Sequence, residues 1–320
     1  ANTNPPIDSE SMVKFIQERA KETGVVKVFP IAAVTKGMEG KEITEIGELY
    51  RAGAVALSDD GWPIENSHIM KLALQYSKMF NIKIISHCED LKLVDDGVMN
   101  EGYMSTILGL KGINRAAEEM GIARDIIMAR YYDAPIHIAH VSTRGGVELV
   151  RQAKAEGVDI TCETAPHYFS ATDNWVSGYD ANTKVNPPLR TPDDVLAVKE
   201  GLRDGTIDTI ATDHAPHHID EKNVEYDIAA FGISGFETAF SLAYTNLVEE
   251  GILDLCDLVE KMSANPARIL NIDGGKLKEG CVADITIADL DAEYTVDTMK
   301  FYSKGKNNPF NGKTVKGKIL

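Results

Sequence analysis

Residues 207–217 read IDTIATDHAPH, an apolar run that is followed directly by a carboxylate and two imidazoles. The run has the length and composition of a buried strand, so Asp213 is predicted to lie just past the carboxyl end of that strand. Three other apolar runs end in the same way, at Asp60, His87 and His140. The carboxyl ends of the strands of a parallel barrel share one rim, so we expect these four side chains to converge on one pocket.

Strand-like and helix-like segments alternate along the chain, which favours parallel βα units and an α/β fold. Strands are predicted at about 25–31, 54–57, 82–86, 135–140, 158–163 and 207–212. A closed (β/α)8 TIM-type barrel needs eight strands. Because the chain also begins at Ala1 rather than at Met, we expect a barrel that lacks its first strand and an N-terminally truncated sequence.

The pattern changes after about Pro266, where a glycine-rich stretch leads into short β-type segments. We therefore predict two domains. Residues 1–266 would form the metal-dependent barrel domain, incomplete at its N-terminus, and residues 267–320 would form part of a small β-sandwich domain.

The composition limits the partners that this chain is expected to have. The net charge is -16, which would repel a polyanion and argues against nucleic acid. No apolar run approaches the roughly 20 residues that cross a bilayer, and no signal peptide is visible, so no membrane association is expected. The four cysteines are scattered, which fits a reducing, cytoplasmic environment. Cys88 lies beside His87 but is interpreted as a small buried filler.

Two imidazoles and two carboxylates at one rim would hold one or two divalent ions, and zinc accepts this mixture of nitrogen and oxygen ligands. Such an ion lowers the pKa of a bound water and polarises a carbonyl group. Asp213 could take up the proton and deliver it to a leaving nitrogen. The pattern therefore predicts metal-assisted hydrolysis of an amide-like bond.

The remaining histidines have weaker signals. His137 and His140 lie three positions apart, an odd spacing that places them on opposite faces of a strand. Strand alternation therefore predicts that His137 packs against a helix. His68 lies on a predicted helix and is interpreted as a surface residue. His167 follows a proline beyond a strand, and its role in the pocket is left open.

Two loops allow either a structural or a binding interpretation. Asn186 precedes two prolines, which make either a rigid turn or a well-fixed substrate donor. Residues 231–235 are either a connector or a segment whose glycines let the backbone approach a planar ligand.

At these positions the chain resembles dihydroorotase of the bacterial class I type, a family of the amidohydrolase superfamily of metal-dependent (β/α)8 barrels. The motifs that carry the resemblance are NTNP at 2–5, SDDG at 58–61, HCED at 87–90, HVST at 140–143, NPPLR at 186–190, ATDHAPH at 211–217 and FGISG at 231–235. They follow the order of the family and extend over essentially the whole chain, so the joint signal is specific.

The resemblance implies a role for each matching residue. Asp60 would be the metal-bridging carboxylate, and His87 and His140 would bind the second zinc. Asp213 would be the metal-bound catalytic acid and base. The implied substrate contacts are Asn2, Asn186 and His217, partly to a carboxylate, with Phe231 and Gly232 meeting the pyrimidine ring through their backbone. The implied reaction is the reversible hydrolysis of dihydroorotate to N-carbamoyl-L-aspartate in pyrimidine biosynthesis.

One departure from the family pattern concerns the first metal. The family carries a His-x-His pair on its first strand, and these 320 residues contain none. We expect the motif just upstream of Ala1, and we expect the 320-residue segment alone to be inactive.

Other assignments remain as alternatives. Dihydropyrimidinase, hydantoinase and allantoinase resemble one another in using a carbamylated lysine as the metal bridge, and Asp60 at that position favours dihydroorotase. A non-catalytic scaffold for aspartate transcarbamoylase is a further alternative. The resemblance leaves open a homodimer and an association with that enzyme.

Overall fold

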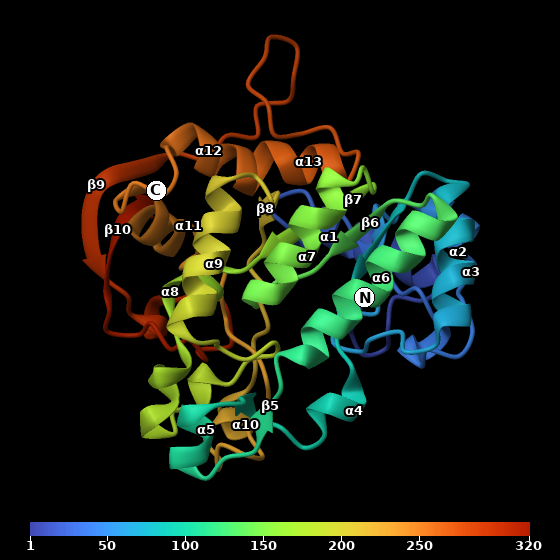
Figure 1. Ribbon diagram of the computed structural model, residues 1–320. Coiled ribbons are helices and arrows are strands. Elements are labelled where there is room, and N and C mark those ends of the chain that lie inside the picture. Colours follow the sequence, from blue (N-terminus) through green and yellow to red (C-terminus); the bar gives the residue numbers. More distant parts are fainter.

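The computed structural model describes residues 1–320 and is built around one curled sheet of six parallel strands (Figure 1). In spatial order these strands are β1 (Ile31–Ala32), β2 (Ala56–Leu57), β3 (Lys83–Ser86), β6 (Ile136–Ile138), β7 (Ile160–Thr164) and β8 (Thr209–Ile210). Each strand pairs in parallel with the next one along the sheet. The predicted α/β class with a barrel-type parallel sheet is confirmed.

A long helix precedes each strand of the sheet and covers its outer face (Figure 1). These helices are α1 (Glu10–Thr23), α2 (Ile46–Ala52), α3 (Ser67–Lys78), α6 (Ala116–Tyr132), α7 (Arg144–Ala155) and α9 (Pro192–Arg203). Their apolar residues and those of the strands form one continuous buried core. Side-chain caps mark the starts of α3 and α9, because the Asn66 side chain accepts the His68 N–H and Thr191 forms a capping box with Asp194.

The first strand is shorter than predicted. Residues 25–30 are not part of β1, and Val25 is 99% exposed. Strand pairing with the neighbouring segment begins only where the Val55 N–H donates to the Pro30 carbonyl. A β-branched sequence does not form a strand where it has no partner strand to pack and pair with.

Shorter elements follow β3, β7 and β8 and gather at the carboxyl ends of the strands (Figure 1). They are α4 (Leu91–Val94), β4 (Met99–Asn100), α5 (Tyr103–Leu108), β5 (Gly112–Ile113), α8 (Pro166–Ser170) and α10 (Ile219–Lys222), with 3-10 turns at Asp173–Gly178 and Ala181–Thr183. A further 3-10 turn, Lys36–Met38, follows β1.

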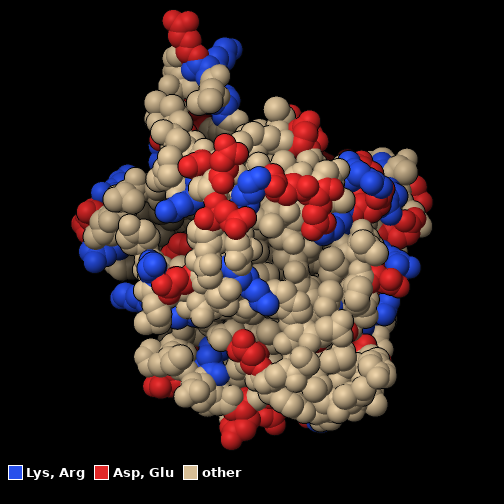
Figure 2. Space-filling view, turned by 90° about the vertical axis from the view of Figure 1, so that its left-hand side faces the viewer, with Lys and Arg blue, Asp and Glu red and all other residues tan.

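The C-terminal part contains α11 (Ala239–Ala243), α12 (Leu255–Val259) and α13 (Asn265–Ile269), then the antiparallel strands β9 (Ala288–Thr295) and β10 (Thr314–Ile319). Two π-helical turns, Tyr244–Val248 and Glu260–Ala264, and a 3-10 turn, Thr298–Lys300, complete it. Val315 of β10 shares a buried cluster with Leu242 of α11 and Ala165. The loop between α13 and β9 projects from the molecule and carries charges of both signs (Figures 1 and 2). The small antiparallel sheet is present, and the domain boundary at 266 stays a prediction.

No helix combines the length and the apolar character that crossing a bilayer demands.

Candidate metal centre

Three of the four rim residues form a compact group. Asp60 follows β2, His87 follows β3 and His140 follows β6, and one ligand atom of each lies within 4.8 Å of those of the others. His87 Nδ1 is 2.9 Å from His140 Nε2, and Asp60 Oδ1 is 3.4 Å and 3.3 Å from these two nitrogens. A carboxylate and two imidazoles this close together are a donor set that fits a divalent ion of zinc type.

The electrostatics of this group also favour a cation. Burial opposes the charged form of Asp60, but hydrogen bonds from His140 and His87 hold the pKa of its carboxyl well below the usual range. Burial likewise opposes protonation of His87, and hydrogen bonds to Asp60 and Glu89 outweigh it and raise the pKa of His87 to about 10. The carboxylates of Asp60 and Glu89 therefore favour positive charge at this group.

Asp213 follows β8 and lies beside this group rather than within it. Its Oδ2 is 3.7 Å from His167 Nε2. Burial raises the pKa of Asp213 to about 6; His140 opposes this rise, and the nearby carboxylates of Asp60 and Glu163 add to it. The backbone φ angles of His140 and Asp213 are 36° and 45°, a left-handed conformation that L-residues adopt at a cost. Such strain is typical of residues that a fold holds in place for function.

Glu89 is a residue of the centre to which the sequence analysis gave no role. Its Oε2 lies 3.3 Å from His87 Nε2 and accepts a hydrogen bond of 3.2 Å from Asn186 Nδ2. Asn186 Oδ1 is buried and has no hydrogen-bond partner. Glu89 thus orients the His87 imidazole through its second nitrogen and links the candidate metal centre to Asn186. The sequence feature that could have indicated this role is the position of Glu89 two residues after His87.

Two other buried carboxylates hold the rim loops in place. Asp59 accepts the backbone N–H groups of Val34 and Thr35 at 2.7 Å and 3.1 Å, so it fixes the turn from which Asp60 projects. Glu118 of α6 accepts the backbone N–H groups of Ser142 and Thr143 at 2.9 Å and 3.0 Å, directly after His140.

Arg190 carries the positive charge that compensates Glu118. Both side chains are almost fully buried, and Arg190 Nη2 lies 3.2 Å from Glu118 Oε2. Arg190 Nε also donates to Ser142 Oγ at 3.0 Å. The NPPLR motif therefore supplies both Asn186 at the centre and the counter-ion of a structural carboxylate.

The prediction that His137 packs against a helix is wrong. His137 points into the barrel, where its ring nitrogens lie 2.8 Å from Thr161 Oγ1 and 3.1 Å from Glu163 Oε2. It lines an interior cavity of about 400 Å³ together with Asp60. Alternation failed as a guide because β6 ends at Ile138, so His140 lies outside the strand whose alternation was applied.

The structure also shows where the other residues with weak sequence signals lie. Cys88 is a buried core residue whose Sγ lies 3.4 Å from Asp125 Oδ2, as its interpretation as a filler predicted. His68 is exposed on α3, as predicted. His167, which was left open, is buried against Tyr168 and reaches Asp213, while its Nε2 has no hydrogen-bond partner.

Two of the expected substrate contacts are linked to the group, Asn186 through Glu89 and Asn2 through a shared cavity. Asn2 lines the interior cavity with Asp60. A bridge between His214 and Ile233 brings the ATDHAPH and FGISG segments side by side, and a Cβ at Gly232 would come within 3.0 Å of the His217 ring. The Gly232 N–H already donates to the Lys184 carbonyl at 2.9 Å.

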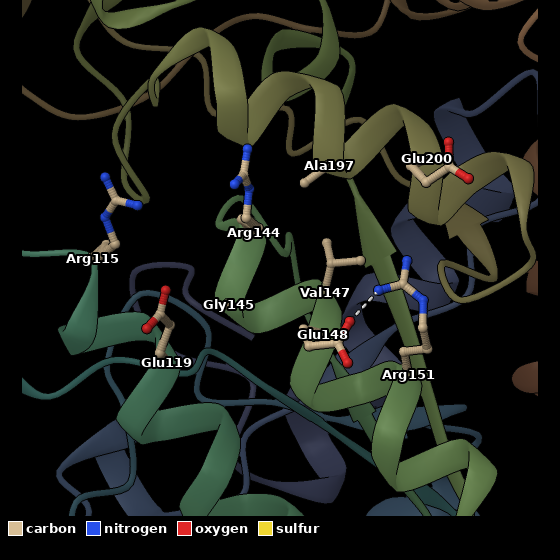
Figure 3. A pocket seen from close by; sticks show the side chains of 9 residues that line it. All are labelled: Arg115, Glu119, Arg144, Gly145, Val147, Glu148, Arg151, Ala197 and Glu200. Atoms are coloured by element: carbon tan, nitrogen blue, oxygen red, sulfur yellow. Dashed lines mark hydrogen bonds and ion pairs between the residues drawn. The ribbon is translucent and has the colours of Figure 1, made fainter.

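A second groove lies elsewhere, on the outer face between α6, α7 and α9 (Figure 3). Its volume is about 520 Å³, and arginines alternate with glutamates along its walls. Glu148 and Arg151 pair with each other there, as the figure shows. None of the rim residues lines it, so the chemistry is assigned to the strand ends and not to this groove.

Comparison with known proteins gives consistent sequence matches. A family model described as dihydro-orotase-like matches residues 1–146. A dihydroorotase from Ruminiclostridium cellulolyticum is 60% identical over 311 residues, which cover 97% of this chain and 73% of that protein. A dihydroorotase from Acetivibrio thermocellus is 58% identical over 318 residues, covering 99% of this chain and 75% of that protein.

Solved structures with the same architecture include other cyclic amidohydrolases. An L-hydantoinase (dihydropyrimidinase) from Arthrobacter aurescens matches with a TM-score of 0.88 at 26% identity, over 99% of this chain and 73% of that one. A dihydropyrimidinase from Brevibacillus agri matches with a TM-score of 0.85 at 19% identity, over 100% of this chain and 72% of that one. At that identity the second match shows the fold alone.

Proposed function

The chain belongs to the dihydroorotase family, and from this premise we propose how its residues carry out the reversible hydrolysis of dihydroorotate to N-carbamoyl-L-aspartate. The observation that carries the proposal is the Asp60–His87–His140 group at the strand ends of a chain 60% identical to a dihydroorotase. The reaction adds water across the ring amide, so the C–N bond breaks, the carbonyl carbon becomes a carboxylate and the nitrogen takes up a proton.

We propose that Asp60, His87 and His140 hold zinc. The donor set of two imidazoles and one carboxylate supports this assignment. When bound, the ion activates water and polarises the carbonyl that is attacked. Glu89 keeps the His87 ring in the orientation in which Nδ1 faces Asp60 and His140, because it binds the opposite nitrogen. One or two ions are compatible with this role.

Asp213 is the proposed acid and base of the reaction. A carboxyl whose pKa lies near 6 takes up a proton at neutral pH far more readily than an ordinary aspartate. His167 lies 3.7 Å away and is buried, and burial lowers the pKa of its imidazole to about 3. A neutral ring beside Asp213 leaves the aspartate as the group that carries the proton to the leaving nitrogen.

Substrate contacts are proposed for Asn2, Asn186 and His217, with Phe231 and Gly232 beside the ring. The unpartnered, buried Oδ1 of Asn186 supports its part, because a buried acceptor lacks a donor until a ligand N–H supplies one. The Gly232 N–H is already bonded to Lys184, so contact with the ring at this position falls to the Phe231 backbone or to carbonyl oxygens.

The alternative substrates are dihydropyrimidines and hydantoins, as indicated by the names of the enzymes in the solved structures. Those matches are 26% and 19% identical, against 60% for the dihydroorotase relative, so dihydroorotate is favoured. A non-catalytic scaffold for aspartate transcarbamoylase remains the alternative from another functional class, and the compact metal group speaks for catalysis instead.

The test uses protein expressed from its complete reading frame and loaded with zinc. We expect interconversion of dihydroorotate and N-carbamoyl-L-aspartate, and loss of both zinc and turnover in His140→Ala. The matched control is His68→Ala, an exposed histidine on α3 that should change neither. Hydrolysis of a hydantoin or dihydropyrimidine but not of dihydroorotate would establish the alternative substrate class. Absence of zinc and of any hydrolysis would establish the scaffold.

The expectation that these 320 residues alone do not turn over substrate stays a prediction. Zinc content and turnover measured on this chain alone test it, since the Asp60 group predicts that zinc binds even where turnover fails. A homodimer and an association with aspartate transcarbamoylase likewise stay predictions, which light scattering of the protein with and without that enzyme tests.

A further inference from the structure

Two buried lysines contact the two chain segments that carry Asn186, Phe231 and Gly232. Lys184 is 2% exposed and Lys222, at the end of α10, is 5% exposed. Neither ammonium group forms a salt bridge with a carboxylate, and both are bonded to backbone carbonyls instead. A lysine this deeply buried without an acidic partner is rare, because desolvation of its charge is costly.

Lys222 connects two separate segments of the chain. Its Nζ donates to the carbonyls of Ala181 and Lys184 at 2.9 Å and 3.2 Å, and to the carbonyl of Ala230 at 2.6 Å. An ammonium group has three N–H donors, and all three are used. The first two carbonyls precede Asn186 in the chain, and the third directly precedes Phe231.

Lys184 repeats the same connection. Its Nζ donates to the Asp227 carbonyl at 2.9 Å and lies 4.5 Å from the centre of the Phe231 ring, within the range of a cation–π contact. Its carbonyl accepts the Gly232 N–H at 2.9 Å. The segment before Asn186 and the segment that carries Phe231 and Gly232 are therefore held together by both lysines.

We propose that Lys184 and Lys222 are positioning residues, which clamp residues 181–186 against residues 226–232 and so fix the wall formed by Asn186, Phe231 and Gly232 for a cyclic, anionic amide substrate. The inference rests on the proposed function, because that function assigns substrate contacts to this wall. The two lysines contact the wall through its backbone carbonyls and the Phe231 ring, and no substrate contact is assigned to them.

Both ammonium groups are desolvated, which supports a role in positioning the wall rather than in stabilising the fold. Burial lowers the pKa of Lys184 to about 8, and burial together with the charge of Lys184 lowers that of Lys222 to about 8. The folded protein therefore disfavours these charges, and apolar side chains of similar volume are the less costly way to fill a core. What the ammonium groups provide is direction, because Lys222 fixes three backbone carbonyls and Lys184 fixes one.

The test compares Lys222→Met and Lys184→Met with a matched control, Lys261→Met. Lys261 is also buried and donates to one backbone carbonyl, that of Ile207, which precedes β8 and lies away from the wall. Kinetics are measured on the zinc-loaded protein expressed from its complete reading frame. We expect KM for dihydroorotate to rise on the order of 10-fold in the two wall variants, since small displacements of binding groups cost up to about 100-fold. Zinc content should stay unchanged, and Lys261→Met should keep the original KM.

Hydrogen exchange at the Gly232 amide provides a readout that does not depend on activity. The wall variants should lose protection of this amide, and Lys261→Met should retain it. Unchanged KM and unchanged protection in both wall variants would overturn the proposal. If the unmodified protein fails to hydrolyse dihydroorotate, the proposed function fails and the exchange data still decide whether the clamp exists. Should Lys222→Met not fold, Lys222→Gln, which keeps two N–H donors, should show a partial loss of protection.

Discussion

Asp213 lies outside the compact group of Asp60, His87 and His140, so proton transfer and metal retention should separate at the level of single residues. We expect Asp213→Asn to lower turnover by at least about 100-fold, because an amide cannot exchange the proton. At least one equivalent of zinc should remain, held by the other three ligands. Turnover assays and metal analysis of the same preparation check this. Complete loss of zinc would place Asp213 among the essential ligands instead.

Glu118 is predicted to be the most important structural carboxylate near the rim. Glu118→Gln would leave the buried guanidinium of Arg190 without its counter-ion, so we expect a loss of about 3–5 kcal/mol in the free energy of unfolding. Urea denaturation measures it. The control is Glu148→Gln, which breaks an exposed pair with Arg151 and should cost less than about 1 kcal/mol. Equal losses in the two variants would contradict the assignment.

Single residues also show where sequence reasoning stops. Asp60, His87 and His140 could be predicted because strand ends are local signals and the parallel topology brings them together. The role of Glu118 could not be predicted, since its partners Ser142 and Arg190 are 24 and 72 positions away in the chain and no local pattern links them. The same holds for the pairing of the two buried lysines with distant carbonyls.

At the scale of elements, some helix starts carry a local sequence signal, whereas strand lengths do not. A helix start is marked by a capping side chain within three residues, as at Thr191. The extent of β1 depends on what lies next to it in the sheet, so the β-branched residues at 25–28 gave a false signal. The wrong prediction for the His137 side chain has a related cause, because side-chain alternation holds only within the paired part of a strand.

The contact between the ATDHAPH and FGISG segments leads to a prediction about Gly232. Its φ is 144°, and a Cβ there would lie 2.7 Å from Ala215 Cβ and 2.8 Å from the Ala215 carbonyl oxygen. Gly232→Ala should therefore push the two segments apart and raise KM for dihydroorotate. The control is Gly251→Ala, which also has a positive φ, of 70°, but no atom within 4 Å of the added Cβ. Both variants should lose about 1 kcal/mol of stability from backbone strain. A KM that is unchanged in Gly232→Ala would show that the two segments can separate without affecting the site.

At the scale of the whole molecule, the two buried lysines make the stability of the fold depend on pH. Their pKa values are about 8 in the folded protein, against 10.5 for an ordinary lysine. Between these pH values the unfolded chain binds protons that the folded chain does not, so the contribution of this pair to the free energy of unfolding rises with pH. The charged groups that act on Lys222 are Lys184 and Asp180, and the charged group that acts on Lys184 is Asp227.

Comparison with Lys222→Met isolates the part of this contribution that depends on Lys222, because the other titrating groups, Lys184 included, are common to both proteins. We expect the unfolding free energy of the unmodified protein, relative to that of the variant, to increase from pH 8 to pH 10.5. Urea denaturation at a series of pH values measures it. Substrate affinity should fall over the same pH range. A neutral lysine has one N–H donor fewer for the clamp, and neutral Lys184 places no charge over the Phe231 ring. Stability and affinity that both rise with pH would contradict a clamp formed by the charged lysines.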